Sequence, residues 1–227
     1  MSYNIAIDGP AGAGKSTIAK KLAARLGFVY VDTGAMYRTI ALYLLRQGIG
    51  PQDEEAIAEA VQKVDVGISY EDGAQQVYLN GENVSSLIRT EKVSQMTSQT
   101  SVYLPVREKL VELQKKLAAA ENVIMDGRDI GTCVLPNADV KIYMTASVEV
   151  RAKRRYLELT QKGAQCSLQE IEQEISERDY RDMHREHSPL RQAEDAVLLD
   201  TSELTIEQVV DAMEEIVKAR GIFAAWK

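Results

Sequence analysis

The sequence has little of the chemistry that metal centres and disulfide frameworks use. Its 227 residues include two cysteines and two histidines. Cys133 and Cys166 stand apart, without a CxxC pair or a metal-ligand spacing, and His184 and His187 lie in a polar, charged stretch. These patterns predict reduced, buried or half-buried thiols and solvated histidines, and they argue against a disulfide or a zinc site.

Long apolar runs and an excess of positive charge are also missing. No uncharged apolar stretch approaches the roughly 18 residues that cross a bilayer, and no basic region followed by such a run opens the sequence. The formal net charge is -7 and the pI is about 5.1. We therefore expect a cytoplasmic protein with no nucleic-acid or membrane partner, in which any phosphate-binding groups form local clusters.

A glycine-rich run near residue 10 carries the strongest single motif. An apolar stretch at 4–8 precedes it, and a helical pattern follows it. The run matches the phosphate-binding P-loop with Gly9, Pro10, Ala11, Gly12, Ala13, Gly14, Lys15 and Ser16, and Thr17 continues the site. Glycines let backbone N–H groups surround a phosphate, and the helix start adds a positive dipole end. The motif predicts a bound nucleoside triphosphate, with Lys15 on an exposed loop at the outer phosphates and Ser16 as a Mg²⁺ ligand.

Apolar runs and helical patterns alternate along the chain. Strands are expected at 5–8, 28–32, 123–126, 140–145 and 197–200. Helices are expected at 53–64, 105–120 and 147–161, with two more starting at capping boxes, 167–170 and 205–208. This alternation is typical of a parallel sheet flanked by helices. The segment 66–87, with Asn80-Gly81 as a type I′ turn, predicts a small antiparallel insert.

The P-loop leaves the phosphoryl acceptor open, and two further features bear on it. The chain lacks the Asn-Lys-x-Asp guanine reader of GTPases and the acidic pair of motor-type ATPases, which favours a phosphotransferase. Late arginines recur at helical spacing: Arg151, Arg154, Arg155, Arg178, Arg181 and Arg185. They form either a phosphate clamp or a solvated face laced with ion pairs, because acidic residues alternate with them.

Two polar segments follow predicted strands, at 32–38 and 127–129. Ligands of open α/β sheets bind at the carboxyl edge of the strands, so both segments are either parts of a site or ordinary polar loops.

These motifs together resemble the bacterial cytidylate kinase family. The resemblance rests on the segments 9–16, 32–38, 88–90, 106–108, 126–132 and 177–182, in order over essentially the whole chain. The 127–129 neighbourhood and the antiparallel insert are far more specific than the P-loop. The resemblance implies the α/β fold of P-loop nucleoside monophosphate kinases: a central parallel sheet flanked by helices, a small antiparallel acceptor-side insert and a helical lid.

The resemblance also implies roles for individual residues. The acceptor phosphate is held by Thr33, where the family's usual residue is serine, and by Arg38, Arg128 and Arg178. Cytosine is read by Ser98, Arg107 and Arg185, with Asp129 in the same pocket and Asp182 on the ribose. Charge on the transferring group is neutralised by Lys15, Arg128, Arg151, Arg155 and Arg178. Ser16 is the metal ligand, and whether Asp32 or Asp126 assists it stays open.

The implied activity is reversible, Mg²⁺-dependent transfer of the γ-phosphoryl group of ATP to CMP or dCMP in pyrimidine nucleotide metabolism. The alternatives are a P-loop kinase for another small acceptor and an ATP-binding regulatory module. We expect a monomer with one kinase domain over 1–227. Its core is expected at 1–34, 104–150 and 190–227, its acceptor lobe at 35–103 and its lid at 151–189.

Overall fold

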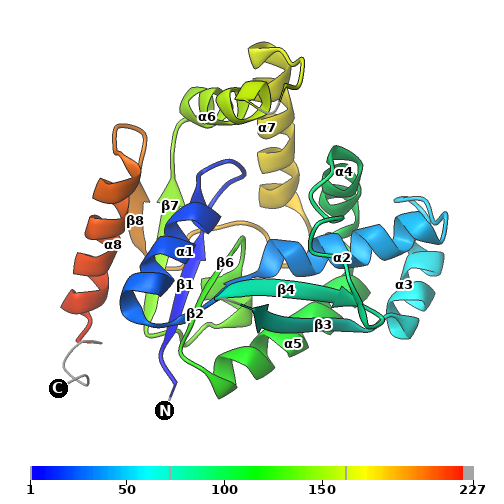
Figure 1. The fold of residues 1–227 in the computed structure, drawn as a ribbon, viewed down its shortest axis with the longest axis horizontal. Helices are drawn as coiled ribbons and strands as arrows, with labels where there is room; N and C mark the ends of the chain where they lie inside the picture. Colours follow the sequence, from blue (N-terminus) through cyan, green and yellow to red (C-terminus); the bar gives the residue numbers. More distant parts are fainter. Residues whose placement is uncertain (1, 72, 162, 222–227) are drawn as a thin grey trace. The chain divides into compact units, whose positions relative to one another are not determined.

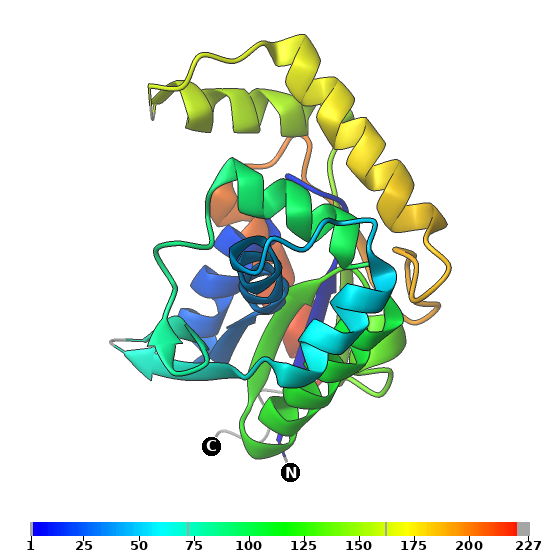
Figure 2. The same ribbon diagram turned by 90° about the vertical axis from the view of Figure 1, so that its right-hand side faces the viewer.

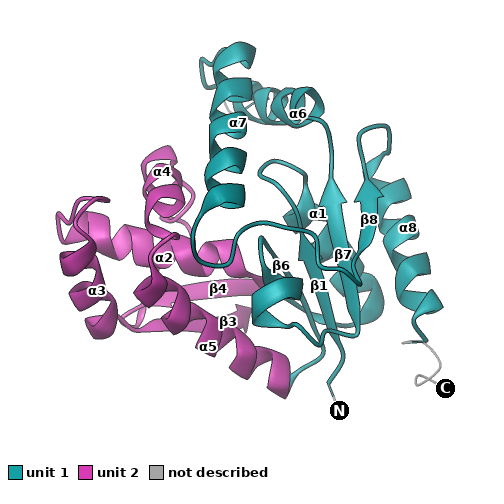
Figure 3. Ribbon diagram, turned by 180° about the vertical axis from the view of Figure 1, so that it is seen from behind, with its two compact units in different colours: residues 1–30, 121–227 teal, residues 31–120 magenta. Residues whose placement is uncertain are grey.

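The computed structural model describes residues 2–71, 73–161 and 163–221. Residues 1, 72, 162 and 222–227 of the predicted core, insert and lid ranges lie outside this description. The chain divides into two compact units, residues 1–30 with 121–227 and residues 31–120 (Figure 3). The division into core, acceptor lobe and lid stays a prediction. No helix of the described ranges is long and apolar enough to cross a membrane.

The first unit is built on a five-stranded sheet with the order β2-β6-β1-β7-β8 (Figure 1). Its strands are β1 (Asn4–Asp8), β2 (Val29–Asp32), β6 (Val123–Gly127), β7 (Val140–Thr145) and β8 (Val197–Asp200). β1 pairs in parallel with β6 and β7, and β7 pairs in parallel with β8. The predicted parallel sheet is confirmed, and the P-loop and the 127–129 turn leave the same edge of it.

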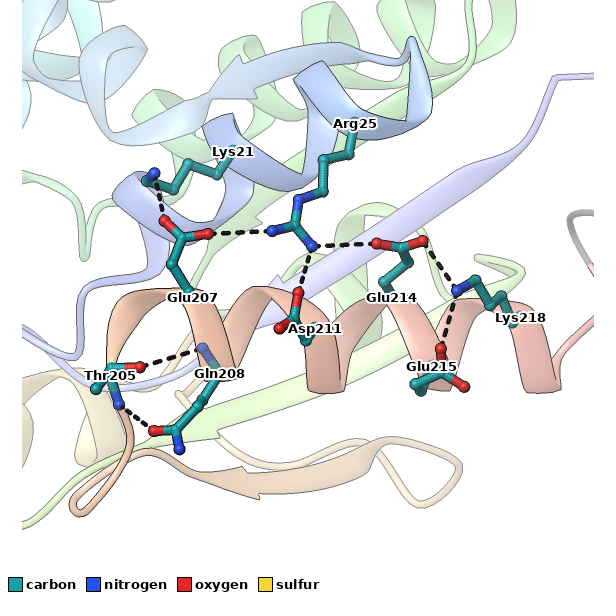
Figure 4. Close-up of polar contacts among 9 residues, drawn as sticks. All are labelled: Lys21, Arg25, Thr205, Glu207, Gln208, Asp211, Glu214, Glu215 and Lys218. Carbon is teal, nitrogen blue, oxygen red and sulfur yellow. Dashed lines mark hydrogen bonds and ion pairs between the residues drawn. The ribbon is translucent and has the colours of Figure 1, made fainter.

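Two helices pack together on this sheet, α1 (Lys15–Leu26) and α8 (Ile206–Ala219). Ile18, Leu22, Val210 and Met213 share one buried apolar cluster with the strands. Figure 4 shows the exposed side of the contact, where ion pairs join Lys21, Arg25 and Lys218 to Glu207, Asp211, Glu214 and Glu215. Water and salt screen these exposed pairs, so the apolar cluster is the main attachment.

The remaining elements of the first unit are the short π-helix η1 (Ile130–Val134) and the helices α6 (Val148–Gln161) and α7 (Leu168–His184). α6 and α7 are linked through Gly163 and pack against each other (Figure 2). Ser167 precedes α7 as expected, but its side chain makes no capping hydrogen bond, so the capping box predicted there is wrong. The box at Thr205 and Gln208 is confirmed, with both of its hydrogen bonds formed.

The second unit consists of α2 (Thr33–Arg46), α3 (Glu54–Lys63), α4 (Glu91–Thr100), α5 (Leu104–Ala120) and a three-stranded antiparallel sheet. The sheet joins β3 (Val66–Glu71), β4 (Ala74–Leu79) and β5 (Glu82–Asn83), which confirms the antiparallel insert. Asn80 and Gly81 both have positive φ, 49° and 84°, as a type I′ turn requires.

The segment 32–38 is a helix start and not a loop. Asp32 caps α2, because its carboxylate accepts a hydrogen bond from the Ala35 N–H at 2.9 Å. Thr33 and Arg38 therefore lie in the first two turns of α2. Gly34 is typical of a loop because glycine has a low helix propensity, but the N-cap aspartate stabilises the helix enough to compensate for one glycine.

Candidate active site

The P-loop backbone needs glycine at its two ends. Gly9 has φ of 151°, and a Cβ there would lie 1.9 Å from the carbonyl oxygen of Met144 in β7. Gly14 is the left-handed N-cap of α1, with φ of 88°. Since the first N–H groups of a helix have no partners within it, the loop and the start of α1 together offer donors to an anion.

Lys15 is buried, which corrects the expectation of an exposed loop. Its side chain is 5% exposed, and its Nζ donates to the carbonyl oxygen of Pro10 at 2.7 Å. Burial and then the charge of Arg128 hold its pKa well below the ordinary value, against the opposing effect of Asp126 and Asp8. An anionic phosphate placed beside Lys15 would add to the effect of these carboxylates and favour the charged form of the lysine.

Ser16 and Asp126 form the oxygen pair that a magnesium site needs. The Ser16 hydroxyl donates to Asp126 Oδ2 at 2.8 Å, and the Tyr30 hydroxyl donates to Asp126 Oδ1 at 2.7 Å. Hard oxygen donors of this kind, completed by phosphate oxygens and water, suit Mg²⁺. The carboxylate of Asp32 is otherwise engaged, since it caps α2 and accepts from Arg89 Nη2 at 3.0 Å. The geometry therefore favours Asp126 over Asp32.

Asp8, at the end of β1, was missed by sequence reasoning. Its carboxylate accepts hydrogen bonds from the N–H groups of Ile130 and Gly131, each at 2.7 Å. These bonds fix the turn after β6 that carries Arg128 and Asp129. Burial outweighs the two bonds and raises the pKa of Asp8 from 3.8 to about 6.

A pH-dependent stability difference follows from Asp8. In the folded protein the Asp8 carboxyl group stays protonated up to about pH 6, whereas in the unfolded chain it ionises near pH 3.8. The contribution of Asp8 to the free energy of unfolding therefore falls as pH rises between those two values. Asp8→Asn cannot titrate. The free energy of unfolding of Asp8→Asn, relative to that of wild type, should therefore rise by about 2 kcal/mol between pH 4 and pH 7, most of the roughly 3 kcal/mol that the whole shift is worth at 1.36 kcal/mol per pKa unit. Urea unfolding at several pH values measures this difference, and a difference that stays flat would contradict the assignment.

Charged side chains at the C-terminal end of α7, including its C-cap Arg185, pair with the turn after β6. Arg128 Nε donates to Asp182 Oδ2 at 2.8 Å, and Arg185 Nη2 donates to Asp129 Oδ1 at 3.2 Å. Burial alone would raise the pKa of Asp182, but the charges of Arg128 and Arg178 lower it. The first unit thus brings together five of the residues that the sequence assigned to the acceptor.

The three arginines of α6 have different surroundings. Arg151 is buried and donates to the Ala11 carbonyl oxygen at 2.8 Å. Arg154 donates to the Thr201 carbonyl oxygen at 2.7 Å. Arg155 is partly exposed and pairs with Glu158 at 3.0 Å. Two of the three therefore contact the protein backbone, and the phosphate-clamp role of Arg151 and Arg155 stays a prediction.

The second unit holds the other four predicted acceptor residues: Thr33 and Arg38 on α2, Ser98 on α4 and Arg107 on α5. A Cβ on Gly34 would lie 3.0 Å from Arg38 Nη1, so the Arg38 guanidinium folds over the start of α2. Arg107 is 3% exposed, and its guanidinium lies 5.7 Å from the centre of the Tyr37 ring. The Tyr37 ring and the burial together fix the plane of a guanidinium that has several N–H donors.

The antiparallel insert supports the start of α2 through Gln75, a contact that the sequence did not reveal. The Asp32 N–H donates to Gln75 Oε1 at 2.8 Å, and Gln75 Nε2 donates to the Asp32 carbonyl oxygen at 3.2 Å. Gln75 thus holds both backbone groups of the residue that caps α2. This contact gives the insert a physical means of affecting Thr33 and Arg38.

Comparisons with known proteins agree with this arrangement. A solved gluconokinase from Sinorhizobium meliloti 1021 superposes with a TM-score of 0.51 at 12% identity, covering 96% of this chain and 94% of that one, which supports the α/β fold alone. A protein named cytidylate kinase from Lactobacillus gasseri is 51% identical over 216 residues, covering 95% of this chain and 94% of that protein. One of the same name from Caldicellulosiruptor bescii is 52% identical over 213 residues, covering 94% of each. The family model described as cytidylate kinase matches residues 5–219, and the chain therefore belongs to the cytidylate kinase family.

Proposed function

We propose that the protein transfers the γ-phosphoryl group of ATP reversibly to CMP and dCMP, giving ADP with CDP or dCDP. The observation that carries the proposal is that the P-loop and the Arg128 turn follow the neighbouring parallel strands β1 and β6 at the same edge of the sheet, where the Ser16 hydroxyl donates to Asp126 at 2.8 Å. Lys15 belongs to the triphosphate-binding loop, and Arg128 belongs to the family motif for the acceptor phosphate. We therefore propose that Lys15, from the donor side, and Arg128, from the acceptor side, both contact the phosphoryl group that is transferred.

The chemistry needs alignment and charge neutralisation more than proton transfer. The nucleophile is a phosphate oxygen of the acceptor, which is mostly deprotonated at neutral pH because its second pKa is about 6. Lys15 and the arginines Arg128, Arg151, Arg155 and Arg178 are proposed to spread over the charge of the transferring group. A hydroxyl acceptor would instead need a general base, which weighs against the alternative of a kinase for a hydroxyl-bearing metabolite.

The donor side is proposed to work with Mg²⁺. Ser16 and Asp126 would hold the ion together with phosphate oxygens of ATP. When bound, it neutralises phosphate charge and orients the triphosphate. The loop from Gly9 to Thr17 binds the phosphates themselves, with backbone N–H groups as donors.

The magnesium assignment predicts a specific loss for Asp126→Asn. We expect kcat to fall about 10²-fold and half-maximal rate to need a higher Mg²⁺ concentration, because the amide is a weaker ligand and a weaker acceptor for the Ser16 hydroxyl. Titration of initial rates with MgCl₂ measures both effects. Asp211→Asn, which changes an exposed carboxylate on α8, is the matched control. An unchanged magnesium midpoint in Asp126→Asn would remove Asp126 from the site.

Base selectivity is proposed to come from Ser98, Arg107 and Arg185. Cytosine presents an amino donor and a ring acceptor where uracil presents the reverse, so one set of buried groups cannot satisfy both, and each mismatch costs roughly 1–3 kcal/mol. Ser98→Ala and Arg107→Met should raise KM for CMP and leave KM for ATP nearly unchanged. They should also lower the ratio of kcat/KM for CMP to kcat/KM for UMP. Asp182→Ala should instead change the ratio of CMP to dCMP use. Equal losses for CMP, dCMP and UMP in the base-reading variants would place selectivity elsewhere.

One assay tests the proposed function as a whole. ADP release from ATP, measured by a coupled assay over a panel of nucleoside monophosphates, should be fastest with CMP and dCMP. Release stimulated mainly by another acceptor would favour a different small-molecule kinase. ATP binding without release for any acceptor would favour a regulatory module.

A further inference from the structure

Ala11, the third residue of the P-loop, has both of its backbone groups held by buried charged side chains of α6 and α7. Its N–H donates to Asp179 Oδ1 at 3.0 Å, and its carbonyl oxygen accepts from Arg151 Nη1 at 2.8 Å. Arg151 Nη1 also pairs with Asp179 Oδ2 at 2.5 Å. The three residues form a closed ring of hydrogen bonds that joins the P-loop, α6 and α7.

Every member of this ring is less than a tenth exposed. Arg151 has a third fixed contact, since its Nε donates to the Ala146 carbonyl oxygen at 2.9 Å, where β7 leads into α6. In a buried site such contacts are strong and their geometry is strict, so a displaced partner is not replaced by water. The carboxylate and the Nε and Nη1 groups of the guanidinium are therefore held to one position each, and the role proposed for Arg151 at the transferring phosphate falls to its Nη2.

The ring acts on a loop whose function depends on backbone direction. In a P-loop most N–H groups turn toward the phosphates, and the backbone groups that do not, here the N–H and the carbonyl oxygen of Ala11, need partners elsewhere. Arg151 is such a partner for Ala11, and Asp179 keeps both Arg151 and the Ala11 N–H in place. Asp179 lies one position after Arg178 and three before Asp182 on α7, so the same helix contacts the donor loop and the acceptor-side cluster.

We infer that Asp179 is a positioning residue for the donor nucleotide, which fixes the first part of the P-loop through Ala11 and Arg151. The inference rests on the proposed function only in assigning the P-loop to ATP. Asp179 acts through its two partners and needs no contact with the nucleotide. Replacement of Asp179 should therefore weaken the binding of ATP and ADP much more than the binding of CMP.

The main variant is Asp179→Asn, which keeps the shape of the side chain and removes its charge. The amide oxygen can still accept from Ala11, but the Arg151 guanidinium loses its carboxylate. We expect KM for ATP and the dissociation constant of ADP to rise about tenfold, because a small displacement of a phosphate-binding loop is costly. KM for CMP should stay within about twofold. Glu174→Gln is the control, because it also removes one negative charge from α7 but at an exposed position. It should leave all three constants unchanged.

A second variant separates positioning from the effect of an unpaired buried charge. Arg151→Met with Asp179→Leu removes both charges together, and such replacements of a buried ion pair often keep or raise stability. Its thermal unfolding temperature should be close to that of wild type, while ADP binding by calorimetry should stay about tenfold weaker. Tight ADP binding in this double variant, or unchanged ADP binding in Asp179→Asn, would overturn the inference.

Calorimetric ADP binding also keeps this inference separate from the proposed function. If the wild-type protein binds ADP but phosphorylates neither CMP nor dCMP, the proposed function fails. The comparison of ADP affinities among the wild-type, Asp179→Asn and Glu174→Gln proteins then still decides the role of Asp179.

Discussion

Lys15→Met should lower kcat for CMP phosphorylation by about 10²- to 10³-fold, the loss typical of removing one preorganised donor from a developing charge. The side chain is buried and bonded to Pro10, so it is already held where the phosphates are expected. Methionine keeps the length of the stem and removes only the ammonium. Steady-state kinetics with saturating ATP and CMP measures the loss.

The fold should survive this substitution, for a reason that burial provides. The folded protein lowers the pKa of Lys15 through burial and through Arg128, which means that its charged form is disfavoured by folding. A neutral replacement removes that penalty, so the unfolding temperature should be equal to or above that of wild type. Lys21→Met, an exposed change on the same helix, is the control. A variant that keeps more than a tenth of wild-type kcat, a loss below about 1.4 kcal/mol, would contradict the role of Lys15.

Local sequence signals predicted most of the elements because their physical causes are local. The Asn80-Gly81 turn needs two residues that tolerate positive φ, and both adopt it. Thr205 and Gln208 satisfy each other's backbone across one helical turn. The P-loop is similar, since its glycines, its lysine and its flanking strand and helix all lie within about 25 residues.

The supporting carboxylates could not be predicted, because their partners are distant in the chain. Asp179 is 168 positions from Ala11, and Asp8 is 122 positions from Ile130. Each of these aspartates looks like any polar residue at a strand end or on a charged helix. Their role arises only when the sheet and the helices of the first unit bring the backbone N–H groups to them, and no composition or spacing rule encodes that approach.

The acceptor side gives the second large expected effect. Arg128→Met should lower kcat/KM for CMP by about 10²-fold, since a charge-assisted hydrogen bond to a phosphate contributes about 1.5–3 kcal/mol and arginine can form two. Arg38→Met, in the second unit, should lower kcat/KM for CMP by a factor of the same order. KM for ATP should change less than threefold in both variants, because each residue belongs to a segment assigned to CMP.

Arg128→Met also leaves Asp182 buried without its partner, so stability and acceptor binding must be separated. Arg128→Met combined with Asp182→Leu removes both charges and should regain the unfolding temperature, while its kcat/KM for CMP should stay below that of Asp182→Leu alone, which accounts for the ribose contact assigned to Asp182. Arg191→Met, an exposed change in the same unit, is the control for charge alone. Titration of each variant with ATP and with CMP separates the two sides of the reaction. A large loss of ATP affinity in Arg38→Met and Arg128→Met, with CMP affinity unchanged, would mean that the donor and acceptor sides have been assigned in reverse. A residue that binds only the acceptor phosphate cannot weaken ATP binding while CMP binding stays the same.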